Sequence, residues 1–269
     1  SDSVSIVDVA TLRVVRTLHV GDEPRDIVFA GAGRNRAFIS AAHRGQNRPG
    51  DPQLLTPSVG RADVWVFDAT NLGASAGGDE IAIVNAFGDT PRALAVSPDG
   101  LTVYLAVFHS GNKTTTVSEG ALPTPAPLPT VSGLPAPQVG VMLQQVGPTT
   151  WRDVNGSDHN GLVRFSLPDQ DVFTIDADAT VLDASAITSS VSSVGTILFN
   201  MVVHPQNGTI YVSNTDANNM DRFEGSGATS LRGELHRAQI SLISGGVAQP
   251  RRLNPHIVYT NLTPAQIHE

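Results

Sequence analysis

Short stretches of β-branched and aromatic residues recur along this chain, and each is bounded by glycine, proline, aspartate or asparagine. Runs of this length and composition are typical of β-strands rather than of helices. Three of them resemble one another and close on an aspartate: residues 2–8, 63–68 and 171–176. The pattern therefore predicts an all-β protein built from repeated strands.

Two further elements follow each of these stretches in the same order. Val20-Gly-Asp-Glu-Pro-Arg25 matches Phe87-Gly-Asp-Thr-Pro-Arg92, and the segment from Val194 fits the same frame. A tight-turn sequence and another strand come next, as in Ser97-Pro-Asp-Gly100 and His204-Pro-Gln-Asn-Gly208. Proline fixes φ in such turns, while glycine and asparagine tolerate positive φ. Each repeat thus predicts three or four antiparallel strands.

A single sheet of this size cannot bury both of its faces, but sheets arranged radially can, as in a β-propeller. The strand Tyr211-Val-Ser-Asn214 differs by one residue from Tyr-Val-Thr-Asn, and the repeat resembles the YVTN-type β-propeller family over residues 1–107 and 170–214. The resemblance implies a propeller of about seven blades. It also implies a secreted or surface protein of bacteria or archaea, in some cases beside c-type cytochrome modules.

The repeats divide the chain into three parts. We expect propeller blades 1 and 2 in residues 1–111, a Pro-rich insertion in residues 112–170, and blade 3 with the start of blade 4 in residues 171–269. About three to four blades would leave open sheet edges, which natural proteins avoid. The sequence therefore predicts a piece of a larger propeller, with a complete small domain of different architecture as the alternative.

The insertion contains the run Leu122-Pro-Thr-Pro-Ala-Pro-Leu-Pro129, which predicts extended polyproline-like chain. The segment is poor in periodic apolar residues, so we expect a long surface loop rather than a blade. Such a loop could be an inert linker or an arm that packs on a neighbouring subunit or domain.

Composition and charge exclude several classes of function. The 269 residues carry 17 basic and 25 acidic side chains, a net charge of −8, and no cysteine. An acidic chain without a basic patch is a poor partner for nucleic acid, and no apolar run is long enough for a membrane helix. The absence of cysteine excludes thiolate metal sites and haem attachment within this segment.

Two loops rich in oxygen ligands are candidates for a Ca²⁺ site. Hard cations prefer clustered carboxylate, amide and hydroxyl oxygens. Both loops could equally be turns stabilised by Asp and Asn side chains. The first candidate set is Asp216, Asn218, Asp221 and Glu224, and the second is Asp153, Asn155, Ser157 and Asp158.

Other polar residues that recur have structural interpretations. Asp8, Asp68 and Asp176 close the repeated stretches, and we expect them to end strands and accept hydrogen bonds from turn N–H groups. His204 occupies the serine position of the Ser-Pro-Asp-Gly turn, which also predicts a structural role. No catalytic residue set stands out.

The sequence favours a non-enzymatic, extracytoplasmic β-propeller that acts as a scaffold or interaction module, whether periplasmic, secreted or on the cell surface. Its partner would be another protein or a missing C-terminal part of its own. One alternative is the propeller domain of a redox or electron-transfer protein, with haem only in the missing sequence. A second is a homo-oligomeric surface-layer or filament component.

Overall fold

The computed structural model describes residues 2–258 except 51–52, 54–55, 57–58, 122–139, 154, 165, 167 and 220–233. These residues form strands joined by turns and short 3-10 helices, with no α-helix among them. In the same residues no helix is long and apolar enough to cross a membrane. The 3-10 helices are η1 (Ala32–Arg34), η2 (Gly45–Asn47), η3 (Glu119–Ala121), η4 (Asn160–Leu162) and η5 (Ala184–Ala186).

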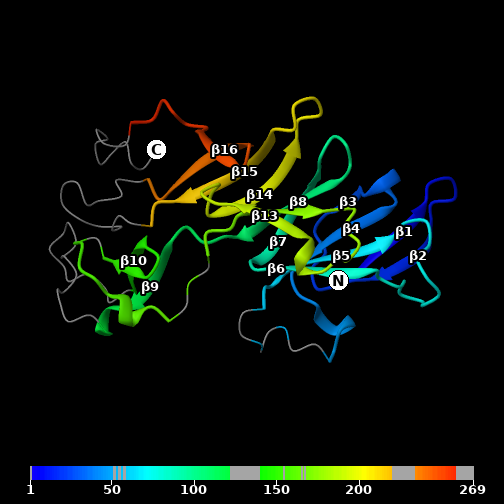
Figure 1. Cartoon of the computed structure of the whole chain (residues 1–269), viewed down its shortest axis with the longest axis horizontal. Coiled ribbons are helices and arrows are strands. Elements are labelled where there is room, and N and C mark those ends of the chain that lie inside the picture. Colours follow the sequence, from blue (N-terminus) through cyan, green and yellow to red (C-terminus); the bar gives the residue numbers. More distant parts are fainter. Residues whose placement is uncertain are drawn as a thin grey trace. The chain divides into compact units, whose positions relative to one another are not determined.

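The first complete sheet is a four-stranded antiparallel meander, referred to below as blade A (Figure 1). Each strand pairs with the next along the chain, for example Ile27 with Ile39 and Ile39 with Trp65. The apolar residues alternate between its two faces, as a two-residue strand period requires. Its strands are β3 (Ile27–Ala30), β4 (Arg36–Ala41), β5 (Ala62–Asp68) and β6 (Ala82–Ala86).

Blade B repeats this meander, although 62 residues separate its second strand from its third. Its strands are β7 (Asp89–Val96), β8 (Thr102–His109), β12 (Val172–Asp176) and β13 (Ile187–Val191). Blade C contains β14 (Ile197–Val203), β15 (Ile210–Ala217), β16 (His236–Ser244) and β17 (Val247–Arg252), in that spatial order. The bridge between Ile197 and His109 joins blade C to blade B.

Two more strands precede blade A and pair with each other in an antiparallel hairpin, β1 (Ser3–Asp8) and β2 (Arg13–His19). They correspond in sequence to the third and fourth strands of the blades, because residues 2–8 align with 63–68 and 171–176. The sequence repeat is therefore offset from the blade by two strands. Residues 236–244 form β16, the third strand of blade C.

The blades stack face to face through three apolar cores. Phe38, Val64 and Leu105 belong to the core between blades A and B, and Val172, Leu198 and Val212 to the core between blades B and C. A third core joins Leu18 of β2 to Ile39, Trp65 and Phe67 of blade A. Stacked four-stranded blades of this kind define a partial β-propeller. The all-β, propeller-type fold expected from the sequence is confirmed.

The turns that link these strands also form as expected. In the Pro98-Asp-Gly turn the N–H of Gly100 donates to the carbonyl of Ser97 over 2.9 Å, and Gly100 has a φ of 82°. His204 accepts from the N–H groups of Gln206 and Asn207 through Nδ1, which confirms its structural role.

The chain divides into two compact units. The blades make up most of the first. The second consists of residues 111–169, 215–239 and 252–269, and it contains β9 (Thr114–Ser118), β10 (Gly140–Gly147) and β11 (Thr150–Arg152). These three strands form one sheet over a small core of Val117, Leu143 and Trp151.

The insertion in blade B is therefore not only a loop, as the sequence suggested, because it carries this sheet. Val141 and Leu143, two residues apart on β10, both pack into this core. The Pro-rich run from Leu122 to Pro129 lies outside the described residues.

Candidate functional site

The long insertions of all three blades leave the framework at the same topological position, between the second and third strands. They comprise residues 42–61 in blade A, 110–171 in blade B and 218–235 in blade C. The turns between the first and second strands are much shorter. Loops held on a rigid framework are where binding residues usually lie. The insertions, and the residues that anchor them, are the candidate functional site.

Asp171 anchors the insertion of blade B. Its side chain is fully buried at the entry to β12. One carboxylate oxygen accepts from the Ser110 hydroxyl, and the other from the Val194 N–H over 2.6 Å. Ser110 and Asp171 stand at the two ends of the insertion, while Val194 belongs to the connection between blades B and C. One carboxylate thus joins the base of the insertion to the next blade.

Asp63 holds the corresponding position in blade A and is also fully buried. It accepts from Asn85 Nδ2 over 2.7 Å and from Gln53 Nε2 over 3.1 Å, and Arg44 Nε lies 3.4 Å away. Arg44 and Gln53 belong to the insertion itself, and Gln53 is buried. A buried carboxylate needs such donors because desolvation otherwise penalises its charge. The network therefore fixes the path of this insertion.

Sequence reasoning missed the burial of these two aspartates and emphasised the aspartates at the other end of the same strands. The signal was present, because Asp2, Asp63 and Asp171 open the three aligned stretches. Asp2 also contacts the insertion of blade A, since Gln46 Nε2 donates to its carboxylate and Asn47 Nδ2 to its carbonyl.

The aspartates that close the strands behave as expected. Asp8 accepts from the N–H of Thr11, Asp68 from the N–H of Thr70, and Asp176 from the N–H of Asp178. Hydrogen bonds from Thr11 and Thr70 lower the pKa of Asp8 and Asp68 respectively. Their role as strand-ending turn residues is confirmed.

The glycines of the Val-Gly-Asp frame lie against the second strands at this end of the blades. A Cβ on Gly21 would lie 2.1 Å from the carbonyl oxygen of His43, and one on Gly195 would lie 2.2 Å from Asn214 Oδ1. Only a residue without a side chain allows so close an approach. Gly21 therefore lets the connection before blade A approach the chain just after β4, and Gly195 lets the connection before blade C approach Asn214 of β15.

The metal candidates around Asp153 form a tight loop held by protein donors. Asp153 Oδ1 accepts from the N–H groups of Asn155 and Ser157, both over 2.9 Å, and its Oδ2 lies 2.9 Å from His159 Nε2. Asp158 pairs with Arg152 over 2.7 Å. Both carboxylates thus have protein partners, in the manner of an Asp-stabilised turn.

The second metal candidate set is only partly visible. Asp216 lies at the end of β15, and Asn218 donates from Nδ2 to the carbonyl of Glu234 over 3.2 Å. Asp221 and Glu224 lie outside the described residues. No group of three or more His, Cys, Asp or Glu that could hold a metal ion occurs in the part of the chain that the structure describes.

The Asp153–His159 pair gives the second unit a dependence on pH. Burial alone would raise the pKa of Asp153, but hydrogen bonds from His159, Ser157 and Asn155 lower it below 3.8. A lowered pKa in the folded state stabilises the fold at pH values above the ordinary pKa of an aspartate. That contribution disappears as the pH falls through the folded-state pKa. We expect acid titration below about pH 4 to loosen this unit. Trp151 fluorescence would report the change, and Asp153→Asn would flatten the titration.

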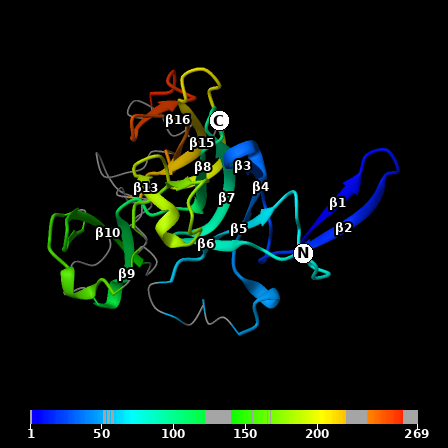
Figure 2. The ribbon, with the colours of Figure 1, turned by 45° about the vertical axis from the view of Figure 1, so that its right-hand side comes forward.

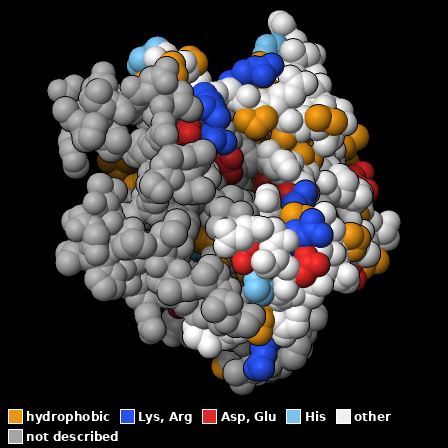
Figure 3. Space-filling model, turned by 90° about the vertical axis from the view of Figure 1, so that its left-hand side faces the viewer, with side chains coloured by type: hydrophobic (Ala, Val, Ile, Leu, Met, Phe, Trp, Pro, Cys, Tyr) orange, Lys and Arg blue, Asp and Glu red, His pale blue; other side chains and the backbone are white. Residues whose placement is uncertain are grey.

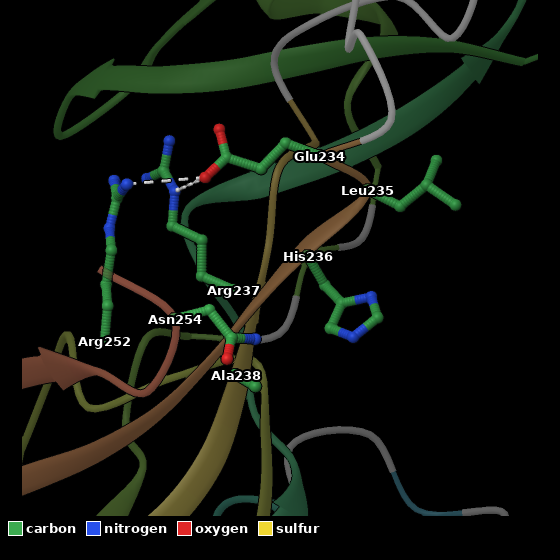
Figure 4. A pocket seen from close by; sticks show the side chains of 7 residues that line it. All are labelled: Glu234, Leu235, His236, Arg237, Ala238, Arg252 and Asn254. Carbon is green, nitrogen blue, oxygen red and sulfur yellow. Dashed lines mark hydrogen bonds and ion pairs between the residues drawn. The ribbon is translucent and has the colours of Figure 1, made fainter. Parts of the chain in front are cut away.

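A pocket lies beside the start of β16 and the end of β17, within the second unit (Figure 4). Glu234 Oε1 accepts from Arg237 Nε over 3.0 Å and lies 3.4 Å from Arg252 Nη1. Figure 4 shows these three side chains turned toward one another, while Leu235 and His236 point away from them. The carboxylate therefore ties the two strands together at the insertion of blade C.

The insertions of blades B and C also touch each other within the second unit. Asn219 Nδ2 donates to Thr114 Oγ1 over 3.2 Å. In the view of Figure 3, basic and acidic side chains are interspersed over the described surface rather than separated by sign. A mixed surface of this kind is typical of a solvated protein face.

These features define the class of protein as a β-propeller segment whose blades carry anchored insertions. No family model and no curated protein matches the sequence. Similar solved structures include hydrazine synthase of Kuenenia stuttgartiensis, with a TM-score of 0.37 and 17% identity over 94% of this chain and 60% of that one. A chain of the mitotic checkpoint complex has a TM-score of 0.33 and 10% identity, over 93% of this chain and 57% of that one. A functionally unknown protein from Desulfotomaculum acetoxidans DSM 771 has a TM-score of 0.29 and 9% identity, over 93% of this chain and 76% of that one.

The chain thus spans 60% of the length of the hydrazine synthase chain that it matches. At these TM-scores none of the three likenesses bears on activity, so the function rests on the chain's own geometry.

Proposed function

We propose that this chain is part of a non-enzymatic, extracytoplasmic interaction module of the YVTN-propeller type, which binds a protein partner through its insertions. One observation carries the proposal: three blades with the same four-stranded antiparallel order each place their longest insertion between the second and third strands. The turns between the first and second strands are short in all three blades, whereas the insertions differ widely in length. A framework that holds long loops rigidly suits recognition.

The anchoring of the insertions supports the same proposal. Asp63 and Asp171 hold the bases of two insertions with buried hydrogen bonds, so the insertions begin from fixed positions. Loops that are ordered before binding lose less conformational entropy when a partner binds. The kinship with the YVTN family, and with it the location outside the cytoplasm, rests on the repeat and on Tyr211-Val-Ser-Asn214 in β15.

Site-specific photo-crosslinking in extracts of the native host tests the proposal. A photoreactive residue is placed at Thr116 in the insertion of blade B, and as a matched control at Leu101, which is exposed beside the short turn at the opposite end of β8. We expect a specific crosslinked partner from position 116 and little or none from position 101, because the partner contacts the insertions.

Equal crosslinking at both positions, or crosslinking at position 101 alone, would contradict binding through the insertions. Fractionation of the same cells tests the location, and a purely cytoplasmic protein would refute the extracytoplasmic part of the proposal.

A further inference from the structure

The sequence Gly-Asp-x-Pro-Arg occurs at the start of blades A and B, in residues 21–25 and 88–92, with the same unusual backbone in both copies. The residue before the proline has a positive φ each time, 51° at Glu23 and 54° at Thr90. This conformation is rare outside glycine, above all for a β-branched residue such as threonine. Backbone strain of this kind is concentrated at binding and catalytic sites, so the arginine that follows it is a candidate for such a site.

The two arginines of this motif differ in their partners. In blade A the carboxylate of Glu23 forms an ion pair with Arg25. In blade B a threonine stands in place of that glutamate, and its hydroxyl donates to Asp89 Oδ1 over 2.9 Å. Among the described residues, no hydrogen bond or ion pair reaches the guanidinium of Arg92. Arg92 therefore lacks the carboxylate that its counterpart in blade A has.

Aromatic side chains from two blades lie beside Arg92. Its Cζ is 5.0 Å from the ring centroid of Phe108 on β8, the strand that pairs with β7 in blade B (Figure 2). Phe108 contacts Phe199 of β14 edge to face, with ring centroids 6.0 Å apart. Phe199 is the aligned residue of blade C and is 42% exposed. An unpaired cation and an exposed apolar ring thus lie together, close to the point where the insertion of blade B begins.

We propose that Arg92, Phe108 and Phe199 form a docking point for an acidic segment of a protein partner. A carboxylate of the partner pairs with Arg92, as Glu23 pairs with Arg25, and an apolar side chain next to it lies on Phe199. Arginine and aromatic residues are enriched in protein interfaces, and hydrogen bonds between a guanidinium and a carboxylate are among the strong ones. This inference rests on the proposed function, because it names the chemistry of the partner that the insertions bind.

The direct probe is the capped peptide acetyl-Phe-Glu-Phe-amide, and the same peptide with glutamine in place of glutamate is its control. The chain carries a net charge of −8, so its overall field repels an acidic peptide and only a local cation can retain one. We expect saturable binding of the glutamate peptide by saturation-transfer NMR, and roughly tenfold weaker binding of the glutamine peptide.

Substitutions in the chain test the role of Arg92. Arg92→Gln should weaken binding of the glutamate peptide roughly tenfold to hundredfold, the loss that corresponds to one hydrogen-bonded pair of charged groups. Arg25→Gln is the matched control at the aligned position, and it should leave binding unchanged because Glu23 already pairs with Arg25. Thr90→Glu supplies blade B with the carboxylate that blade A has, so it should block the site while Arg92 stays in place.

No binding of the glutamate peptide up to about 10 mM would overturn the proposal, as would equal binding of the two peptides. Equal losses from Arg92→Gln and Arg25→Gln, or full binding to the Thr90→Glu variant, would also contradict it. Tighter binding of phenylpropionate than of the peptide would assign the site to a small organic acid instead. Photo-crosslinking from the insertion does not use these peptides, so the proposed function and this inference can fail separately.

Discussion

Asp171→Ala is expected to destabilise the blades by about 2–4 kcal/mol, because the substitution leaves the buried Val194 N–H without its acceptor. The Ser110 hydroxyl keeps a second acceptor in the Gly195 carbonyl, 3.0 Å away, so it contributes less to the loss. For a domain of this size the melting temperature would fall by roughly 10 °C. Thermal unfolding followed by circular dichroism measures the effect on the blades, and the fluorescence of Trp65 in a Trp151→Phe background shows whether the loss reaches blade A.

Asp176→Ala is the matched control, since it removes an exposed carboxylate from the other end of the same strand. The Asp176 carboxylate accepts one hydrogen bond, from the N–H of Asp178 in the turn, so its removal should cost about 0.5–1 kcal/mol of stability. Asp171→Asn retains a side-chain oxygen for Val194 and should fall between the two. Similar costs for Asp171→Ala and Asp176→Ala would show that the buried carboxylate does not link the insertion to the next blade.

The sequence was sufficient to predict the strands and turns of the blades because their signals are local. Asp68 and Asp176 end strands through hydrogen bonds to N–H groups two or three residues away, and Gly100 supplies the positive φ of a four-residue turn. Each of these interactions lies within a short window of the chain, so residue type and spacing determine it.

The grouping of strands into blades could not be predicted in the same way, because it depends on pairing between distant segments. β8 and β12 are neighbours in blade B although the insertion separates them, and nothing near either strand identifies the other. The repeat fixes only the order of the elements, so its starting point was offset from the blade by two strands. The three-stranded sheet of the insertion has weaker signals still, since β9 is Thr114-Thr-Thr-Val-Ser118.

The candidate site was harder to predict than the fold for a related reason. Asp63 and Asp171 look like ordinary aspartates at strand ends, and their burial depends on distant segments such as those of Asn85 and Val194. Asp153 shows the opposite case, in which the sequence suggested a binding site and the structure shows a turn. Its loop is rich in oxygen ligands, but the carboxylate accepts hydrogen bonds from the N–H groups of Asn155 and Ser157. Composition identifies groups able to bind a cation, but the loop conformation decides which donors reach them.

The core of the second unit depends on very few residues, so Trp151→Ala should have a large local effect. Trp151 is 6% exposed and packs with Val117 and Leu143, the other buried members of this cluster. Removal of a buried tryptophan typically costs about 3–5 kcal/mol, which a core of this size is not expected to withstand. We expect rapid proteolysis within residues 111–169, detected by mass spectrometry of the fragments.

The blades should remain folded in the same variant. The two tryptophans of the chain lie in different units, so Trp65 becomes the only tryptophan and reports on blade A alone. Its thermal transition should stay within about 2 °C of that in Trp151→Phe. Val146→Ala, at an exposed position of the same sheet, is the control and should leave both the proteolysis and the transition unchanged. A large fall in the Trp65 transition would show instead that the blades need the insertion to fold, and the insertions would then be part of the framework rather than binding elements placed on it.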